Sequence, residues 1–229
     1  MNEDIQRKEK NIHGIDVSHW NGIVDWKYVA KSGIRFAMLK CMNKSNQIEI
    51  NFENNYQECL KNNIYVGVYI YVMATTKEKA KAAIEALLGI LKNRKIRYGV
   101  WLDVEDKVLA DLKEFPELIE FMLDKLHKAG YTAGVYCNLS WYNEYFKGKQ
   151  YLFWIARYPV EDNGEVHPAL DPEIGVCWQY SSKGKVPGIV GNVDMDLAKV
   201  DISKIKEKEK SLVERILEIL GKIISRFLM

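Results

Sequence analysis

Short apolar runs alternate with amphipathic stretches along most of this chain. The short runs carry the aliphatic, β-branched and aromatic residues typical of buried strands. Three longer stretches, residues 51–62, 77–91 and 115–129, repeat apolar positions three and four residues apart, which predicts helices packed on one face. Gly130 follows the third stretch and predicts its end. The predicted strands are residues 14–17, 36–41, 65–72, 98–103, 132–137, 151–155, 176–180 and 193–195.

Strands that alternate with helices favour a parallel sheet with helical crossovers, so the expected fold class is α/β. A complete (β/α) barrel usually takes about 250 residues. The chain has 229 residues, so we expect a compact, modified barrel in which some crossovers are short or lack a helix. An open, doubly wound sheet is the alternative. Residues 14–19 read GIDVSH rather than a glycine-rich phosphate loop, which argues against nucleotide binding.

The two ends differ from the alternating region. Residues 1–11 form a polar extension, residues 12–203 the predicted barrel, and residues 204–229 a charged linker followed by an amphipathic helix. The helix, residues 211–229, reads SLVERILEILGKIISRFLM, and its apolar stripe is too broad to be left in water. Three roles stay open for it: packing on the barrel, association with itself or another partner, or binding to a membrane surface.

Composition sets limits on partners and location. The formal net charge of +2 does not indicate nucleic-acid binding. Residues 1–10 show no secretion signal, and no run of about 18 uncharged apolar residues is present, so we expect a chain made in the cytoplasm without a signal peptide. The four cysteines have no CxxC spacing and are expected to be buried free thiols, although a disulfide is not excluded.

Two carboxylates close together are the strongest chemical signal in the sequence. Asp103 and Glu105 stand two residues apart in the apolar run WLDVED, and in a strand residues with this spacing point to the same face. Trp101 is expected below them. Repulsion and lost solvation should raise the pKa of at least one of the two acids. A protonated acid beside an ionised carboxylate is the equipment for cleaving a glycosidic bond.

Other acids and aromatics fall near the ends of predicted strands. Asp16 lies in the first strand and Asp194 in the last, and these strands become neighbours if the barrel closes. Asp106 and Asp196 are expected to face solvent. No calcium-loop spacing or metal-ligand set is visible, so neither a metal nor a cofactor is predicted. The aromatics expected to line a sugar-binding cleft are Tyr69, Tyr71, Tyr136, Trp154 and Trp178.

An ordered set of short motifs resembles the family 25 glycoside hydrolases, the Chalaropsis-type lysozymes. The matching segments cover roughly residues 12 to 200, and the set is far more specific than any one of its members. In order, they read GIDVS and WNG in residues 14–22, FAMLK in 36–40, VGVY in 66–69, WLDVE in 101–105, GVY in 134–136, WIARY in 154–158, WQY in 178–180 and VD in 193–194.

This resemblance implies a flattened (β/α) barrel and N-acetylmuramidase activity on bacterial peptidoglycan. It implies that Glu105 is the proton donor, paired with Asp103, and that Asp16 and Asp194 are the other catalytic acids. There are two departures from the family pattern. Ile70 stands where the family often has His, and Asp196 replaces a more usual Asn. Both are expected to affect substrate binding more than the catalytic step.

Several alternatives stay open. In one mechanism, Asp103 orients the substrate's own N-acetyl group as nucleophile, which gives retention. In the other, a more distant acid such as Asp194 activates water, which gives inversion. We favour retention. The competing functions are a non-catalytic cell-wall binding module and a chitinase-like glycosidase. A wall-degrading enzyme with no visible leader is expected to be an endolysin that reaches the wall after release, with an exported autolysin as the alternative.

Overall fold

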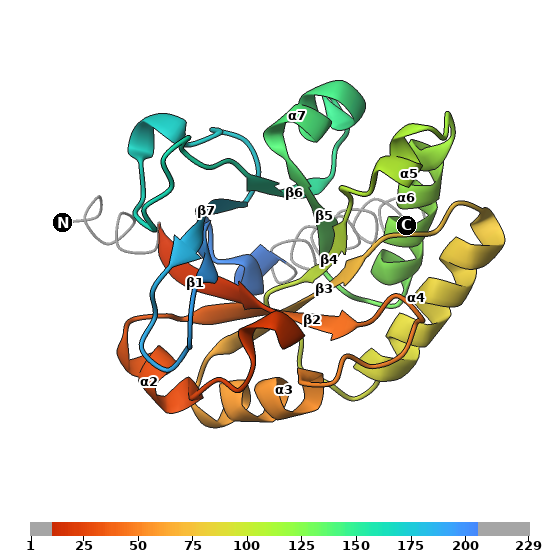
Figure 1. Cartoon of the computed structure of the whole chain (residues 1–229). Helices are drawn as coiled ribbons and strands as arrows, with labels where there is room; N and C mark the ends of the chain where they lie inside the picture. The colour runs from red at the N-terminus through yellow and green to blue at the C-terminus, as the bar shows by residue number, and fades with distance from the viewer. Residues whose placement is uncertain (1–10, 206–229) are drawn as a thin grey trace, which may run out of the picture.

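The computed structural model describes residues 11–205, which form a closed barrel of eight strands (Figure 1). The strands follow one another around the barrel in chain order. The closed barrel therefore replaces the open sheet that the sequence left as an alternative. The strands are β1 (Ile12–Val17), β2 (Phe36–Met42), β3 (Tyr65–Tyr71), β4 (Val100–Asp103), β5 (Ala133–Asn138), β6 (Leu152–Ala156), β7 (Cys177–Gly184) and β8 (Val193–Ala198).

One strand runs against the others. Strands β1 to β7 pair in parallel, whereas β8 is antiparallel to both β7 and β1. The expected parallel sheet is therefore present in β1 to β7, and the expectation was wrong for β8. The cause is the connection: only residues 185–192 separate β7 from β8, and a parallel return requires a crossover of about a dozen residues or more.

Helices cover the first half of the barrel and are scarce over the second half. Figure 1 shows α2 to α6 along one side of the sheet. Within the described residues, the connections from β5 onward contain only short helical turns, and the β7–β8 connection contains none. The expected shortening of crossovers is thus confirmed. The helices are α2 (Trp26–Lys31), α3 (Phe52–Lys61), α4 (Lys77–Leu91), α5 (Lys107–Ala110), α6 (Phe115–Lys128) and α7 (Leu139–Trp141), with the short turns η1 (His19–Asn21), η2 (Tyr142–Phe146), η3 (Pro168–Leu170) and η4 (Ile202–Lys204).

The long helices begin and end where local chemistry dictates. The Thr76 hydroxyl accepts a hydrogen bond from the Lys79 amide and caps the start of α4. Helix α6 buries the apolar residues of its inner face, including Ile119 and Leu126, against the sheet. Gly130 follows the helix at a φ of 88°, a conformation that glycine adopts without strain. The three helices predicted at residues 51–62, 77–91 and 115–129 are therefore present where the apolar spacing placed them.

Two apolar layers result, one outside the barrel wall and one inside it. The outer layer lies between the strands and the helices, and the inner layer fills the barrel with large aromatics. Gly134 makes room for them, since a Cβ at this position would lie 2.6 Å from the ring of Trp101. The aromatic residues of the inner layer are Phe36, Tyr69, Tyr98, Trp101, Tyr136 and Trp154.

The remaining sequence predictions have mixed outcomes. All four cysteines are buried free thiols, as expected. Within residues 11–205 no helix is long and apolar enough to cross a membrane. Residues 1–10 of the predicted polar extension (1–11) and the predicted helix of residues 211–229 lie outside the described part of the chain, so the three roles suggested for the helix stay predictions.

Candidate active site at the mouth of the barrel

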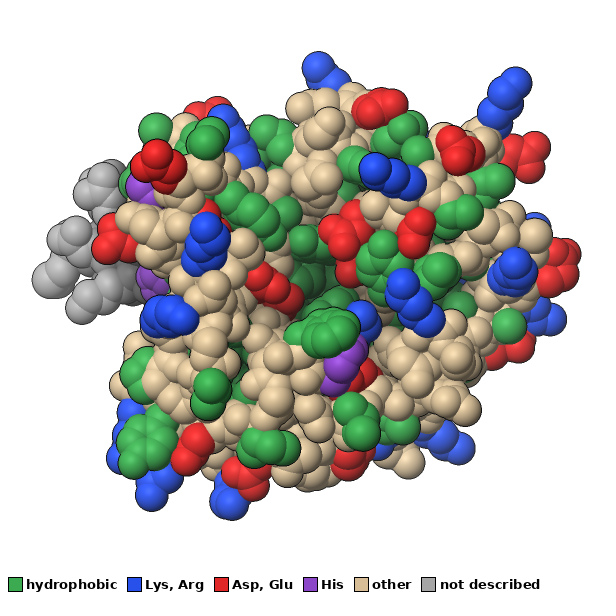
Figure 2. Space-filling view, in the orientation of Figure 1, with side chains coloured by type: hydrophobic (Ala, Val, Ile, Leu, Met, Phe, Trp, Pro, Cys, Tyr) green, Lys and Arg blue, Asp and Glu red, His purple; other side chains and the backbone are tan. Residues whose placement is uncertain are grey.

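The predicted acids gather at one end of the barrel. Asp103 is the last residue of β4, and Asp16 lies one residue before the end of β1. Because β8 is antiparallel, its first residues lie at this same end, and Asp194 stands directly opposite Asp16 in the β1–β8 register. Figure 2 shows acidic side chains around a hollow in the middle of one face. The topology thus brings three strands' carboxylates to one mouth.

Asp103 and Glu105 differ in their surroundings. Strand β4 ends at Asp103, so Glu105 stands in the following loop rather than in the strand that was used to place it. Asp103 is only 6% exposed, and burial together with the nearby Glu105 raises its pKa well above the usual range. Glu105 is open to solvent on one side, but partial burial still raises its pKa. The two form a coupled pair that holds a proton more tightly than a free carboxyl group does.

Lys40 is a basic residue that the sequence analysis did not assign to the site. It lies near the end of β2, and its charge lowers the pKa of both Asp103 and Glu105 against the effect of burial. Its ammonium group also lies 5.7 Å from the centre of the Tyr71 ring. Lys40 therefore limits how far the pKa values of the acid pair rise.

Asp16 is held by a network that centres on Gln179 of β7. The Gln179 side-chain nitrogen donates a hydrogen bond of 2.5 Å to Asp16 Oδ2. Its oxygen accepts hydrogen bonds from the hydroxyls of Tyr136, at 2.7 Å, and Tyr158. Burial, Asp194 and Asp196 raise the pKa of Asp16 well above the usual range, and the Gln179 bond opposes them. Gln179 fixes the orientation of one acid and two phenols.

Asp194 is half-buried on the opposite side of the β1–β8 pair. Burial, followed by the charges of Asp162 and Glu105, raises its pKa to about 6. The influence of Glu105 shows that the acids of β4 and β8 belong to one electrostatic site. A carboxyl group with a pKa near 6 changes its charge within the range in which many enzymes work.

Asp196 was expected to face solvent, and this prediction was wrong. It is fully buried inside the barrel, and the Trp154 indole donates a 2.8 Å hydrogen bond to its Oδ1. Burial raises the pKa of Asp196 well above its usual value. Asp106 is half-buried and accepts a hydrogen bond from the Val108 amide, capping α5. Asp196 is thus a polar support beneath the mouth.

Three of the five predicted cleft aromatics lie at the mouth. Tyr71 is half-buried beside Asp106 and Glu105, which with burial raise its pKa. Tyr69 and Tyr136 are almost buried, and the acids of the site lie close enough to contribute to their raised pKa values. All three phenols therefore lie near the acids of the site.

The two tryptophans of that prediction are placed elsewhere. Trp154 is buried inside the barrel, with its ring 4.5 Å from that of Tyr136 and 6.0 Å from that of Trp101. Trp178 is buried in the outer layer, and its indole donates to the Arg157 carbonyl. Adjacent strand residues point to opposite faces, so Trp178 points outward where Gln179 points inward. Neither indole presents a face to a sugar in this structure, since both are about 1% exposed.

Gln179, Tyr158 and Lys40 are the site residues that the sequence analysis did not single out. A signal for Gln179 was present: a polar residue between the aromatics Trp178 and Tyr180 alternates with them in a strand and needs a buried partner. Tyr158 and Lys40 stand in the motifs WIARY and FAMLK that carry the family resemblance, but no pattern of neighbouring residues marked them as site residues. Among residues 11–205, no group of three or more His, Cys, Asp and Glu is arranged to hold a metal ion.

Residues 15–189 match the family model described as "Glycosyl hydrolases family 25", and the chain belongs to that family. It is therefore a glycoside hydrolase. The uncharacterized protein YegX of Escherichia coli (strain K12) is 29% identical over 194 residues, covering 81% of this chain and 69% of YegX. Lysozyme M1 of Streptomyces globisporus is 27% identical over 198 residues, 80% of this chain and 66% of that protein. A solved glycosyl hydrolase 25 of Streptococcus pneumoniae, GHIP, superposes with a TM-score of 0.70 at 26% identity, over 85% of this chain and 88% of that one.

Proposed function

We propose that this protein is an N-acetylmuramidase, a lysozyme that hydrolyses the β-1,4 bond between N-acetylmuramic acid and N-acetylglucosamine in bacterial peptidoglycan. The observation that carries the proposal is the Asp103–Glu105 pair, whose pKa values are both raised at the mouth of a family 25 barrel. The name of Lysozyme M1 supports the choice of substrate. A binding module would have no use for two neighbouring carboxyl groups with raised pKa values.

Glu105 is proposed as the general acid. It is the member of the pair that solvent and substrate can reach, whereas Asp103 lies beneath it with little exposure. Its raised pKa keeps a larger share of the carboxyl protonated near neutral pH, so it can give its proton to the oxygen of the leaving sugar. Activity should therefore fall as the pH rises through the pKa of the pair.

Asp103 is proposed to orient the reacting sugar. Its Oδ1 is buried and has no hydrogen-bond partner among the described residues, so it is free to accept one from the N–H of the substrate's N-acetyl group. The carbonyl oxygen of that group then attacks C1 as Glu105 protonates the departing oxygen. Glu105, now ionised, takes a proton from the water that opens the resulting ring. This sequence retains the β configuration; water activated by Asp194 would invert it.

Asp16 and Asp194 are proposed to bind the substrate and to tune the electrostatics of the site rather than to donate the proton. Asp16 accepts a hydrogen bond from Gln179, and Asp194 lies opposite Asp16 in the β1–β8 register. Substituting either with Asn should therefore cost less activity than substituting Glu105. The release of the enzyme from the cytoplasm to the wall, and any membrane or self-association through residues 211–229, stay predictions.

The test is product analysis on purified peptidoglycan, with chitin as the competing substrate. Muramidase cleavage creates new reducing ends on N-acetylmuramic acid, which borohydride reduction followed by mass spectrometry identifies. Reducing ends released from chitin but not from peptidoglycan would instead favour the chitinase-like alternative. Proton NMR of the first product reads the mechanism: we expect the β anomer, and an initial α anomer would contradict the role given to Asp103.

A further inference from the structure

We propose that the exposed indole of Trp20 is a sugar-stacking platform at the edge of the mouth, held in place by His19 and Glu49. This inference rests on the proposed glycan substrate and adds a binding residue that the sequence analysis did not predict. Trp20 lies in η1, the turn that immediately follows β1, only four residues after Asp16. Its side chain is 84% exposed, whereas most tryptophans of the chain are buried.

The turn is tied to the site on one side. The Asn21 side-chain nitrogen donates a 3.4 Å hydrogen bond to the carbonyl of Asn192, two residues before Asp194. The turn is also closed on itself, because the Ser18 hydroxyl accepts from the Trp20 amide and the Asn21 side chain accepts from the Ser18 amide. Trp20 is therefore fixed between the strand that carries Asp16 and the hairpin that carries Asp194.

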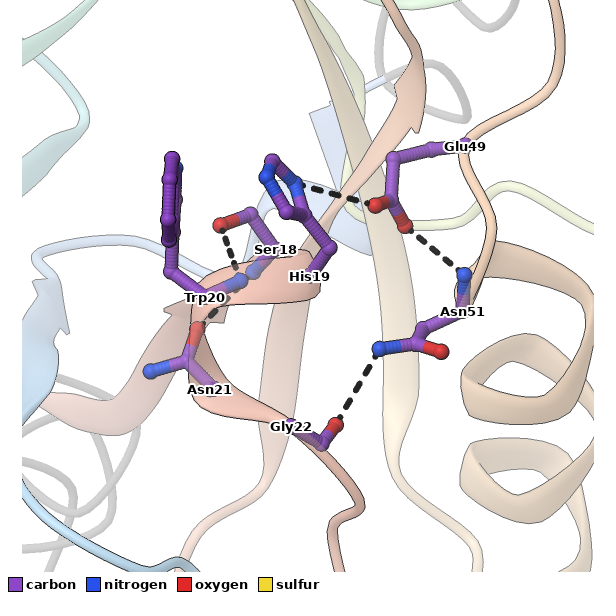
Figure 3. A network of polar contacts seen from close by, with 7 residues as sticks. All are labelled: Ser18, His19, Trp20, Asn21, Gly22, Glu49 and Asn51. Atoms are coloured by element: carbon purple, nitrogen blue, oxygen red, sulfur yellow. Dashed lines mark hydrogen bonds and ion pairs between the residues drawn. The ribbon is translucent and has the colours of Figure 1, made fainter.

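A buried carboxylate ties the turn on its other side (Figure 3). Glu49 lies in the segment between β2 and α3 and is 4% exposed. One of its oxygens lies 3.2 Å from His19 Nδ1, and the other accepts a 3.0 Å hydrogen bond from the Asn51 amide. Asn51 in turn donates to the Gly22 carbonyl at 3.2 Å. Both ends of η1 are thus attached to the same neighbouring segment.

The orientation of the indole suits a flat ligand. Figure 3 shows the Trp20 ring standing beside the His19 ring and away from the polar contacts that fasten the turn. The two ring centres are 4.4 Å apart, so His19 supports one side of the indole. A large apolar ring that is carried by a fastened turn and exposed to water at the edge of an acidic cleft is suited to pack against the C–H face of a pyranose. The polymer chain extending from the cleaved bond supplies such rings.

Trp20 and Glu105 lie on different sides of the mouth, because strands β2 and β3 separate β1 from β4 in the strand order. The sugar that packs on Trp20 is therefore not the one that Glu105 protonates. Loss of the indole should weaken binding of the glycan without changing the chemical step. Such a loss gives a raised KM at a nearly unchanged kcat.

The kinetic test uses glycan strands released from peptidoglycan by an amidase. We expect Trp20→Ala to raise KM about tenfold, the effect of losing one aromatic contact, with kcat within about twofold of wild type. Trp20→Phe should restore most of the affinity. The matched control is Tyr28→Ala, which removes an exposed aromatic from helix α2 on the outside of the barrel. A wild-type KM for Trp20→Ala, or a loss confined to kcat, would overturn the proposal.

A binding test separates this proposal from the catalytic one. In a Glu105→Gln background, iodide should quench the fluorescence of exposed Trp20, and added glycan strands should protect it. The protection should disappear in Glu105→Gln combined with Trp20→Phe. If wild type fails to cleave the strands while protection is seen, the proposed reaction is wrong and the platform stands. If wild type cleaves them and no protection is seen, the platform is refuted.

The positioning role of Glu49 has its own readout. Glu49→Gln keeps an oxygen to accept from the Asn51 amide but removes the charge that faces His19. We expect lower fluorescence anisotropy of Trp20 and a KM between those of wild type and Trp20→Ala. Unchanged anisotropy and unchanged KM would show that Glu49 does not hold the platform.

Discussion

The Gln179 side chain of β7 donates a 2.5 Å hydrogen bond to Asp16 of β1. Strand β8 lies between these two strands in the barrel, so the bond joins strands that do not pair with each other. The same amide accepts from the hydroxyls of Tyr136 and Tyr158. One neutral side chain therefore determines the direction of an acid and of two phenols. Buried polar groups of this kind are costly when one partner is missing.

Replacing Gln179 with Leu should destabilise the protein and reduce its activity. Leu is similar in size but leaves Asp16 and Tyr136 buried without their partner, so the free energy of unfolding should fall by about 2–4 kcal/mol. Urea unfolding measures this change. Gln57→Leu is the control, since Gln57 is exposed and donates its side-chain hydrogen bond to Glu53 on the same helix, and it should change stability by less than about 0.5 kcal/mol. Equal effects of the two substitutions would argue against the network.

Replacing Asp194 with Asn should stabilise the protein at neutral pH while lowering activity. The pKa of Asp194 is about 6 in the folded state and near 3.8 when unfolded, so the folded state loses stability as the pH rises between these values. Asn removes that loss. The variant should exceed wild type by about 2–3 kcal/mol at pH 7 and by nothing below about pH 4.

Unfolding curves from pH 3.5 to pH 8 measure this difference. The control is Asp124→Asn, which removes an exposed carboxylate paired with Lys128 on the outside of the barrel. Its effect should be small and should not grow between pH 4 and pH 7 in the stabilising direction. A pH-independent gain for Asp194→Asn would contradict the assignment of a raised pKa.

The sequence predicted the strands and long helices because their apolar spacing is regular, but the direction of β8 depends on the length of one connection. The alternation rule was applied to Asp103 and Glu105, where the strand ends too early for it to hold. The same rule places Asp196 inward with Asp194, and Trp178 outward beside Gln179. Alternation indicates which face Asp196 and Gln179 share, but their hydrogen-bond partners, Trp154 for Asp196 and Asp16 for Gln179, are set by tertiary packing, which the sequence pattern alone does not contain.

A glycine substitution tests the tight filling of the barrel. A Cβ at Gly134 would lie 2.4 Å from the Leu152 carbonyl oxygen and 2.6 Å from the Trp101 ring, so Gly134→Ala should cost about 3 kcal/mol or more. Gly89 lies within helix α4, where an added Cβ would meet nothing within 4 Å apart from the nearby backbone of its own helix and its chain neighbours, and Gly89→Ala should stabilise by about 0.5–1 kcal/mol. Thermal unfolding of both variants gives the comparison. A Gly134→Ala protein as stable as wild type would mean that the interior is less filled than the structure shows.

The most direct test of Glu105 as the general acid is the rate at which Glu105→Gln releases reducing sugar from purified peptidoglycan. Gln keeps the shape of the side chain and removes only the proton, so the rate should fall by about 10²–10⁴-fold while circular dichroism and the melting temperature show a folded protein. Glu117→Gln, on the exposed face of α6, should keep the wild-type rate. A folded Glu105→Gln protein with a near-normal rate would contradict the assignment of Glu105 as the general acid.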